Sequence, residues 1–157
     1  MENDSNAPDT LNVSGTAGGG GWTITYYDAL SGGSDITSDV IGGGWSTGVL
    51  APGASKEIRV EVTPDSTLAG GSSKEVLVTS TSAFGDASQD AVKAVNVTSV
   101  LPGDANSDGS VNALDITKVE RIIGGLDAQT PGADANQDGN INALDITKVE
   151  RIIAGLG

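Results

Sequence analysis

The N-terminal two thirds of the chain alternate between short apolar runs and glycine-rich breaks. The runs rich in Val, Ile, Thr and Tyr cover residues 10–14, 22–27, 56–63, 74–80 and 91–98. Apolar residues fill every second position at Ile58, Val60 and Val62, with polar residues between them. This alternation is typical of strands with one buried face, and no sustained helical period interrupts it. The pattern predicts an immunoglobulin-like antiparallel β-sandwich over residues 1–99.

The core of this sandwich is expected to be mainly aliphatic, because the chain holds only two Trp, two Tyr and one Phe. We expect Trp22, Trp45, Tyr26 and Phe84 to be its largest apolar groups. Trp22 and Tyr26 are also candidates for a carbohydrate-stacking platform, although packing in the core is the favoured interpretation.

The pattern changes to a helical period in a duplicated segment. Residues 104–126 return as residues 134–156, and only four of the twenty-three positions differ. Each copy ends in apolar residues at three- and four-residue spacings, before a glycine; in the first copy these are Ile116, Val119, Ile122 and Ile123. No amphipathic helix precedes either copy. The duplication predicts two stacked loop–helix units in a small second domain over residues 100–157.

Each copy opens with oxygen-bearing side chains at the spacing of an EF-hand calcium loop, with Gly at the sixth position. The predicted metal ligands are Asp104, Asn106, Asp108, Ser110, Asn112 and Asp115 in the first loop, and Asp134, Asn136, Asp138, Asn140, Asn142 and Asp145 in the second. Ser110 and Asn140 would contribute backbone carbonyls. The twelfth position holds Asp instead of Glu, so its shorter side chain must lie nearer the ion. Asp and Asn also favour turns, but two filled loops in register predict two Ca²⁺ ions.

Composition excludes several other functions. The chain has no Cys and no His, which removes disulfides, zinc sites, thiol nucleophiles and imidazole bases, and we predict no catalytic residues. The net charge of −13 is spread over both parts of the chain, and neither has the basic patch that nucleic acid or an anionic membrane requires. No apolar run is long enough for membrane insertion.

The duplicated DxNxDGxxNxxD loop, with one following helix and a Pro-containing connector, resembles a type I dockerin, a module that docks surface proteins onto cohesin domains. The resemblance implies calcium on the loop residues named above. It also implies partner contacts at Ala113, Leu114, Glu120 and Arg121, and at Ala143, Leu144, Glu150 and Arg151. Ser-Thr and Lys-Arg are common at those places in the family, so the differences here favour a partner other than a standard cellulosomal cohesin.

Residues 1–99 resemble immunoglobulin-like repeats of surface proteins, in the class of CARDB-type and NPCBM-associated modules, through GGGGWTITYYDALSGGSDIT and GWSTGVLAPGASKEIRVEVTP. Such domains act as spacers or adhesion elements. A segment like residues 2–13 lies inside those domains, so we expect the first strand or strands to be missing. Either the sequence is trimmed, or a neighbouring subunit supplies a strand to an edge left open over Val13, Ile24 or Val60.

These features together indicate a non-catalytic extracellular or cell-surface assembly protein that docks through calcium onto a cohesin-like β-sandwich. One alternative is the subunit of a self-assembling filament, a homopolymer joined head-to-tail through the sandwich edge or the dockerin-like module. A weaker alternative is a non-catalytic fragment of a larger carbohydrate-active enzyme. Sequons at Asn3, Asn12 and Asn96 permit N-glycosylation in a suitable cell.

Overall fold

The computed structural model describes residues 1–66, 68–84 and 88–156. The chain forms two compact units, each built from two stretches of sequence. The first contains Met1–Ser66 and Lys74–Asn96, and the second contains Thr67–Ser73 and Val97–Gly157. Among the helices in the described residues, none has the length and apolar character needed to span a membrane.

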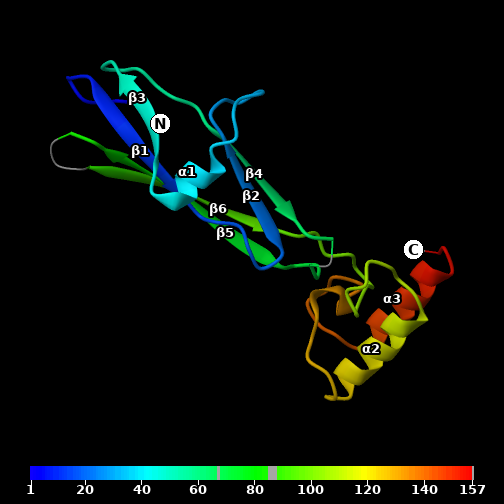
Figure 1. The fold of residues 1–157 in the computed structure, drawn as a ribbon. Helices are drawn as coiled ribbons and strands as arrows, with labels where there is room; N and C mark the ends of the chain where they lie inside the picture. Colours follow the sequence, from blue (N-terminus) through cyan, green and yellow to red (C-terminus); the bar gives the residue numbers. More distant parts are fainter. Residues whose placement is uncertain (67, 85–87, 157) are drawn as a thin grey trace. The chain divides into compact units, whose positions relative to one another are not determined.

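The first unit is built mainly from β-strands in two antiparallel sheets (Figure 1). Its elements in chain order are β1 (Asp9–Gly15), β2 (Trp22–Tyr27), α1 (Thr37–Gly42), β3 (Trp45–Leu50), β4 (Arg59–Pro64), β5 (Ser73–Ser82) and β6 (Gln89–Val97). The larger sheet has the order β3-β1-β5-β6, and β2 pairs with β4 in the smaller one. The five predicted runs correspond to β1, β2, β4, β5 and β6, which confirms a mainly β architecture.

The core of the first unit lies where the inward faces of β2 and β5 meet α1. Its buried members are Ile24, Tyr26, Ile36, Val40 and Val76. Tyr26 is fully buried, its hydroxyl donates to the Thr16 carbonyl at 2.9 Å, and burial raises its pKa. Trp22 is also buried. Both side chains therefore pack inside and present no stacking platform.

Phe84 does not belong to this core, so its sequence prediction was wrong. The side chain is 62% exposed. Phe84 follows the last residue of β5, Ser82, which is also the last β5 residue that pairs with β1. Trp45 is half-buried and packs against the core cluster.

Two elements of the first unit were not predicted. Strand β3 contains Gly48 with φ 71°, and its pairing with β1 changes register between Thr10 and Asn12, so the sequence lacks a clean alternation. Helix α1 has only six residues and buries Val40 alone, too little to produce a period. Both elements depend on contacts with distant parts of the chain.

Strand β6 is one of the two edges of the larger sheet, and it carries three exposed valines. Val92, Val95 and Val97 are 66%, 60% and 61% exposed. The expected open edge does not lie at Val13, because β1 is paired on both sides, with β3 and β5. Ile24 and Val60 lie on β2 and β4, which in the described residues pair only with each other. The N-terminus is engaged as well, since residues 1–3 form backbone hydrogen bonds with residues 53–56.

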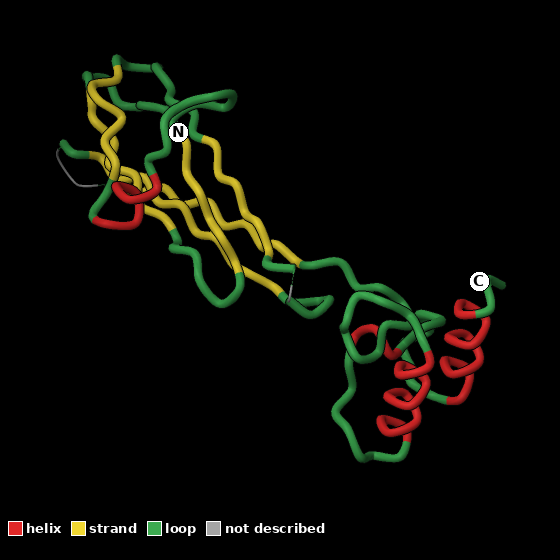
Figure 2. The backbone as a smooth tube through the Cα atoms, turned by 45° about the vertical axis from the view of Figure 1, so that its right-hand side comes forward, coloured by secondary structure: helices red, strands yellow, loops and turns green. Residues whose placement is uncertain are grey.

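The second unit places two helices side by side, each directly after one copy of the loop (Figure 2). These are α2 (Ala113–Ile123) and α3 (Ala143–Ile153), and the 3₁₀ turn η1 (Pro131–Ala133) precedes the second loop. Its apolar core consists of Ala105, Val119, Ile122 and Ala133, with Ile141 and Ile146 packed against them. Each helix buries one apolar stripe, as the three- and four-residue spacing predicted.

A turn from the segment between β4 and β5 completes the second unit. The Gly71 N–H donates to the Thr98 carbonyl at 3.1 Å, and the Thr98 N–H donates to the Ser72 carbonyl at 2.9 Å. Gly71 has φ 79°, and a Cβ there would lie 3.1 Å from Cγ of Pro131. Only glycine suits both the left-handed backbone and this close approach.

Candidate functional site

The two repeated loops of the second unit have the same backbone shape. Ser107 and Gln137 take the left-handed conformation at φ 61° and 60°, and Gly109 and Gly139 both have φ 87°. These paired turns bend residues 104–115 and 134–145 back on themselves. A shape reproduced in both copies is dictated by the local sequence, because only four positions of the repeat differ.

Two carboxylates close each loop by accepting backbone hydrogen bonds. In the first copy, Asp104 accepts from the N–H groups of Asp108 at 3.1 Å and Gly109 at 2.9 Å. Asp115 accepts from those of Asn106 at 3.0 Å and Asn112 at 2.8 Å. The second copy repeats all four bonds, with Asp134 and Asp145 as acceptors. The first and twelfth positions are thereby held on opposite sides of one small loop.

The intervening side chains form a chain of polar contacts. The Asn106 amide donates to Asp108 at 2.8 Å, and Asp108 accepts from the Ser110 N–H at 2.9 Å. In the second copy, hydrogen bonds from the Asn140 backbone N–H and the Asn136 amide lower the pKa of Asp138. Each loop thus gathers carboxylate and amide oxygens around one region.

The ninth position has a role that the sequence analysis missed. Asn112 and Asn142 are the N-caps of α2 and α3, and each accepts from the backbone N–H two residues on at 2.9 Å. With Asp115 and Asp145 at the third helical position they form capping boxes. The Asn-x-x-Asp spacing could have revealed this arrangement. Each loop is therefore fixed to the start of its helix.

The burial of the loop carboxylates fits a cation. Asp115 and Asp145 are 0% exposed and Asp104 is 7% exposed, yet none forms a salt bridge within the described residues. A buried carboxylate with only N–H partners is costly unless a positive charge offsets it. In the described part of the chain no three Asp or Glu side chains cluster as a metal site, so an ion here requires amide and carbonyl oxygens too. Such a mixed set of hard oxygen donors suits Ca²⁺.

The core and connector of the second unit hold the loops in place. Ala105, between two predicted ligands, is 0% exposed, and its carbonyl accepts from the Thr130 hydroxyl at 2.7 Å. The Gly103 N–H donates to the Gly132 carbonyl at 2.8 Å, and a Cβ on Gly132 would collide with the Asp104 carbonyl. The connector therefore packs directly behind the first loop.

The predicted partner residues all lie on exposed parts of the two helices. Leu114 and Leu144 are 64% and 62% exposed in the first turns, and the Glu-Arg pairs lie in the last turns. Arg121 is held by Asp127 through two hydrogen bonds, from Nε at 3.0 Å and Nη2 at 2.9 Å. Lys118 Nζ also lies 3.0 Å from Asp127. Hydrogen bonds from Arg121 and then Lys118 hold the pKa of Asp127 well below its ordinary value.

This ion-paired cluster predicts a pH-dependent contribution to stability. Because the pKa of Asp127 is lower in the folded state, the contribution is complete above its ordinary value of 3.8 and is lost as the pH falls through the folded pKa. We expect the melting temperature of the Asp127→Asn variant to lie below that of the unmodified chain by a constant amount between about pH 7 and pH 5. The difference should shrink below pH 3.8. Thermal melts of both proteins across this range test it; a difference that grows in acid contradicts it.

The predicted glycosylation residues differ in their surroundings. Asn3 is 2% exposed, and its amide donates to the carbonyls of Ala7 and Leu50, both at 2.9 Å. A glycan at Asn3 would replace one of the two amide hydrogens, so at least one of these bonds would have to break. Asn12 is exposed on β1, and Asn96 is half-buried on β6.

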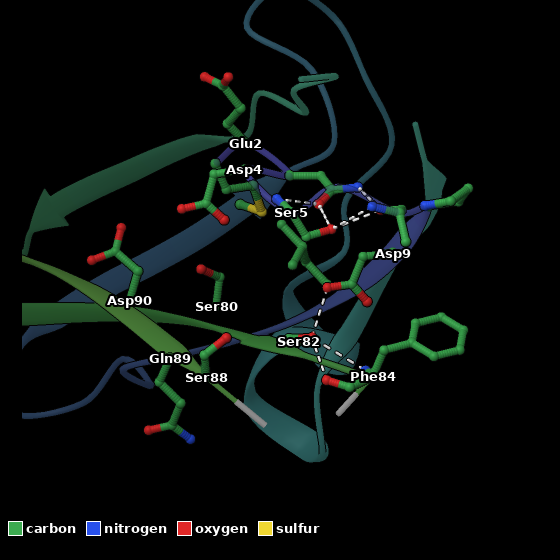
Figure 3. A pocket seen from close by; sticks show the side chains of 15 residues that line it. Glu2, Asp4, Ser5, Asp9, Ser80, Ser82, Phe84, Ser88, Gln89 and Asp90 are labelled. Atoms are coloured by element: carbon green, nitrogen blue, oxygen red, sulfur yellow. Dashed lines mark hydrogen bonds between the residues drawn. The ribbon is translucent and has the colours of Figure 1, made fainter. Parts of the chain in front are cut away.

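A cavity of about 640 Å³ lies at one end of the first unit (Figure 3). Its lining includes the acidic residues Glu2, Asp4, Asp9 and Asp90. Asp9 is buried and accepts from the Ser82 hydroxyl at 2.6 Å. The most buried of these acids is thus already satisfied by the protein.

Comparison with known proteins supports the interpretation of the second unit. Residues 102–154 match the family model described as the Dockerin type I domain, which covers the C-terminal third of the chain. No curated protein and no solved structure matches the chain significantly. Dockerin domains bind calcium and protein partners and occur in extracellular and cell-surface proteins. The match supports a type I dockerin domain at residues 102–154, after the strands of the first unit in the sequence.

Proposed function

We propose that this chain is a non-catalytic assembly protein outside the cell or on its surface, whose second unit docks onto a cohesin-like β-sandwich when calcium is bound. The observation that carries the proposal is the pair of identically hydrogen-bonded acidic loops within the residues that match the dockerin domain. Each loop fixes the start of an exposed helix, so an ion that orders the loop also orders the docking surface.

Two calcium ions, one in each loop, are part of this proposal. In the first loop Asp104, Asn106, Asp108 and Asp115 would supply side-chain oxygens, and Ser110 its carbonyl. The equivalent residues of the second loop are Asp134, Asn136, Asp138, Asn140 and Asp145. Asn112 and Asn142 would act through water, because their side-chain oxygens already cap the helices. Bound Ca²⁺ would offset two of the three carboxylate charges in each loop and would organise the docking surface.

The first unit is proposed to be an immunoglobulin-like spacer that presents the docking unit. Its two antiparallel sheets around a shared core support this interpretation. A spacer needs a stable fold and no reactive site, and the chain has neither Cys nor His to supply one.

Binding to a panel of purified cohesin domains, measured by calorimetry with calcium and with EGTA, tests the docking function. We expect at least one domain to bind with calcium, and EGTA to abolish that binding. Truncation after residue 96 provides the control, because it removes the matched domain together with both loops. Binding that persists in EGTA, or in the truncated chain, contradicts the proposal.

A second candidate function is a subunit of a filament, and the exposed strand β6 favours it. Its valines are at least 60% exposed at the edge of a sheet, where another strand can add. The occupant would be an extended segment of the next identical chain. Electron microscopy of the chain alone separates the candidates, because filaments would form without any cohesin and the docking function predicts none.

A further inference from the structure

The two copies of the repeat have identical helices but different charge environments. Helices α2 and α3 share the sequence ALDITKVERII. In the first copy, Arg121 and Lys118 both form salt bridges with Asp127, which follows the helix. Both cations of α2 are therefore already partnered within the chain.

The second copy lacks this partner. The Arg151 guanidinium donates only to the Leu156 carbonyl, at 3.2 Å, and neither Arg151 nor Lys148 forms a salt bridge in the part of the chain that the structure describes. Among the described residues, no carboxylate follows α3 as Asp127 follows α2. The asymmetry comes from Asp127, which lies just outside the repeated segment 104–126.

This difference determines what each helix can offer a partner. A carboxylate that approaches α2 must compete with Asp127, whose two oxygens already occupy the fork of Arg121. A carboxylate that approaches α3 meets an Arg151 guanidinium of which, among the described residues, only one of the five N–H donors is in use. A partner carboxylate would therefore have to displace Asp127 to bind at α2, and would displace no ion-paired carboxylate of the described residues at α3.

Local charge points the same way. Along α3 as a whole, Asp145 and Glu150 balance Lys148 and Arg151, but neither of these two cations forms a salt bridge in the described residues. On α2, the single carboxylate of Asp127 pairs with both equivalent cations. Leu144, Lys148 and Arg151 follow one another at four- and three-residue spacings, so they share one helix face, and Leu144 is 62% exposed.

We propose that the α3 face formed by Leu144, Lys148 and Arg151 is the docking face, and that it takes a partner surface with carboxylates beside an apolar patch. The inference rests on the proposed docking function. The α2 face has the same sequence, but its Lys118 and Arg121 side chains are already paired with Asp127. Two experiments test the proposal, one without a partner and one with it.

The first experiment maps the reaction of the full chain with phenylglyoxal, an arginine-specific reagent, by mass spectrometry in calcium. We expect Arg151 to react faster than Arg121, because the Asp127 pair shields the Arg121 guanidinium. The Asp127→Asn variant should bring Arg121 to the rate of Arg151. Equal rates in the unmodified chain overturn the asymmetry.

The second experiment compares Arg151→Gln and Arg121→Gln in binding to a cohesin domain that the unmodified chain binds. Loss of a carboxylate partner should weaken binding by about tenfold or more for Arg151→Gln, and by less than about threefold for Arg121→Gln. In the Arg151→Gln background, Asp127→Asn should restore part of the binding by freeing Arg121. Circular dichroism in calcium confirms that each variant is folded.

The outcomes of the second experiment are distinguishable. A larger loss for Arg121→Gln, or equal losses for the two variants, overturns the α3 assignment and leaves the docking function intact. If no cohesin domain binds the unmodified chain, the proposed function fails and the docking role of α3 fails with it, while the reactivity measurement still decides the difference between the two arginines.

Discussion

Chelation of calcium should unfold the second unit and leave the first unit folded. Far-ultraviolet circular dichroism should lose the helical signal of α2 and α3 on addition of EGTA and regain it when calcium returns. Trp22 and Trp45 both belong to the first unit, so tryptophan fluorescence provides an internal control that should not change.

The expected size of this effect follows from the small core of the second unit. Its fully or largely buried apolar residues are Ala105, Val119, Ile122, Ala133, Ala135 and Val149. A core of this kind supplies no more than about 3–5 kcal/mol. Each ion contributes about 2.7 kcal/mol when free calcium is 100 times Kd. Two ions therefore contribute as much as the core itself, and a helical signal that survives chelation would refute the coupling of folding to calcium.

The features that the sequence predicted well are those set by local spacing. The loops need Asp, Asn and Gly at fixed positions, and each helix needs apolar residues three and four apart, so both were visible in residues 104–126. The loops and helices are determined by contacts between residues close together in the chain. The range of β2 was also predicted correctly, from its run of β-forming residues, although β2 pairs with the distant strand β4.

The features that the sequence did not reveal depend on residues far apart. The exposure of Phe84 depends on where β1 stops pairing with β5. Gly71 joins the second unit through Thr98 and Pro131, neither of which is near it in sequence. Arg121 and Asp127 are only six residues apart, yet their ion pair was not predicted. The two helices have the same sequence, and Asp127 lies outside the repeated segment, so a comparison of the repeats does not reveal it.

Replacement of one loop-closing carboxylate should remove one ion and leave the other. Asp115→Ala should lower the calorimetric calcium stoichiometry of the chain from two to one, and Asp145→Ala should do the same. The physical reason is that Asp115 closes the first loop through the N–H groups of Asn106 and Asn112 and has no exposed surface. Leaving these buried donors without an acceptor costs about 1–3 kcal/mol each, so the start of α2 should also be destabilised.

The matched control uses the seventh loop position. Ser110→Ala removes a side chain that is exposed and leaves the backbone carbonyl in place, so this variant should still bind two ions. If Ser110→Ala loses an ion, the side chain and not the carbonyl is the ligand. If Asp115→Ala loses both ions, the two loops fill as one cooperative unit through the core that Ile141 and Ile146 share with Val119, and the assignment of one independent ion to each loop is wrong. If it keeps both, Asp115 is not a ligand, because calcium bound in that loop would have no carboxylate at the twelfth position.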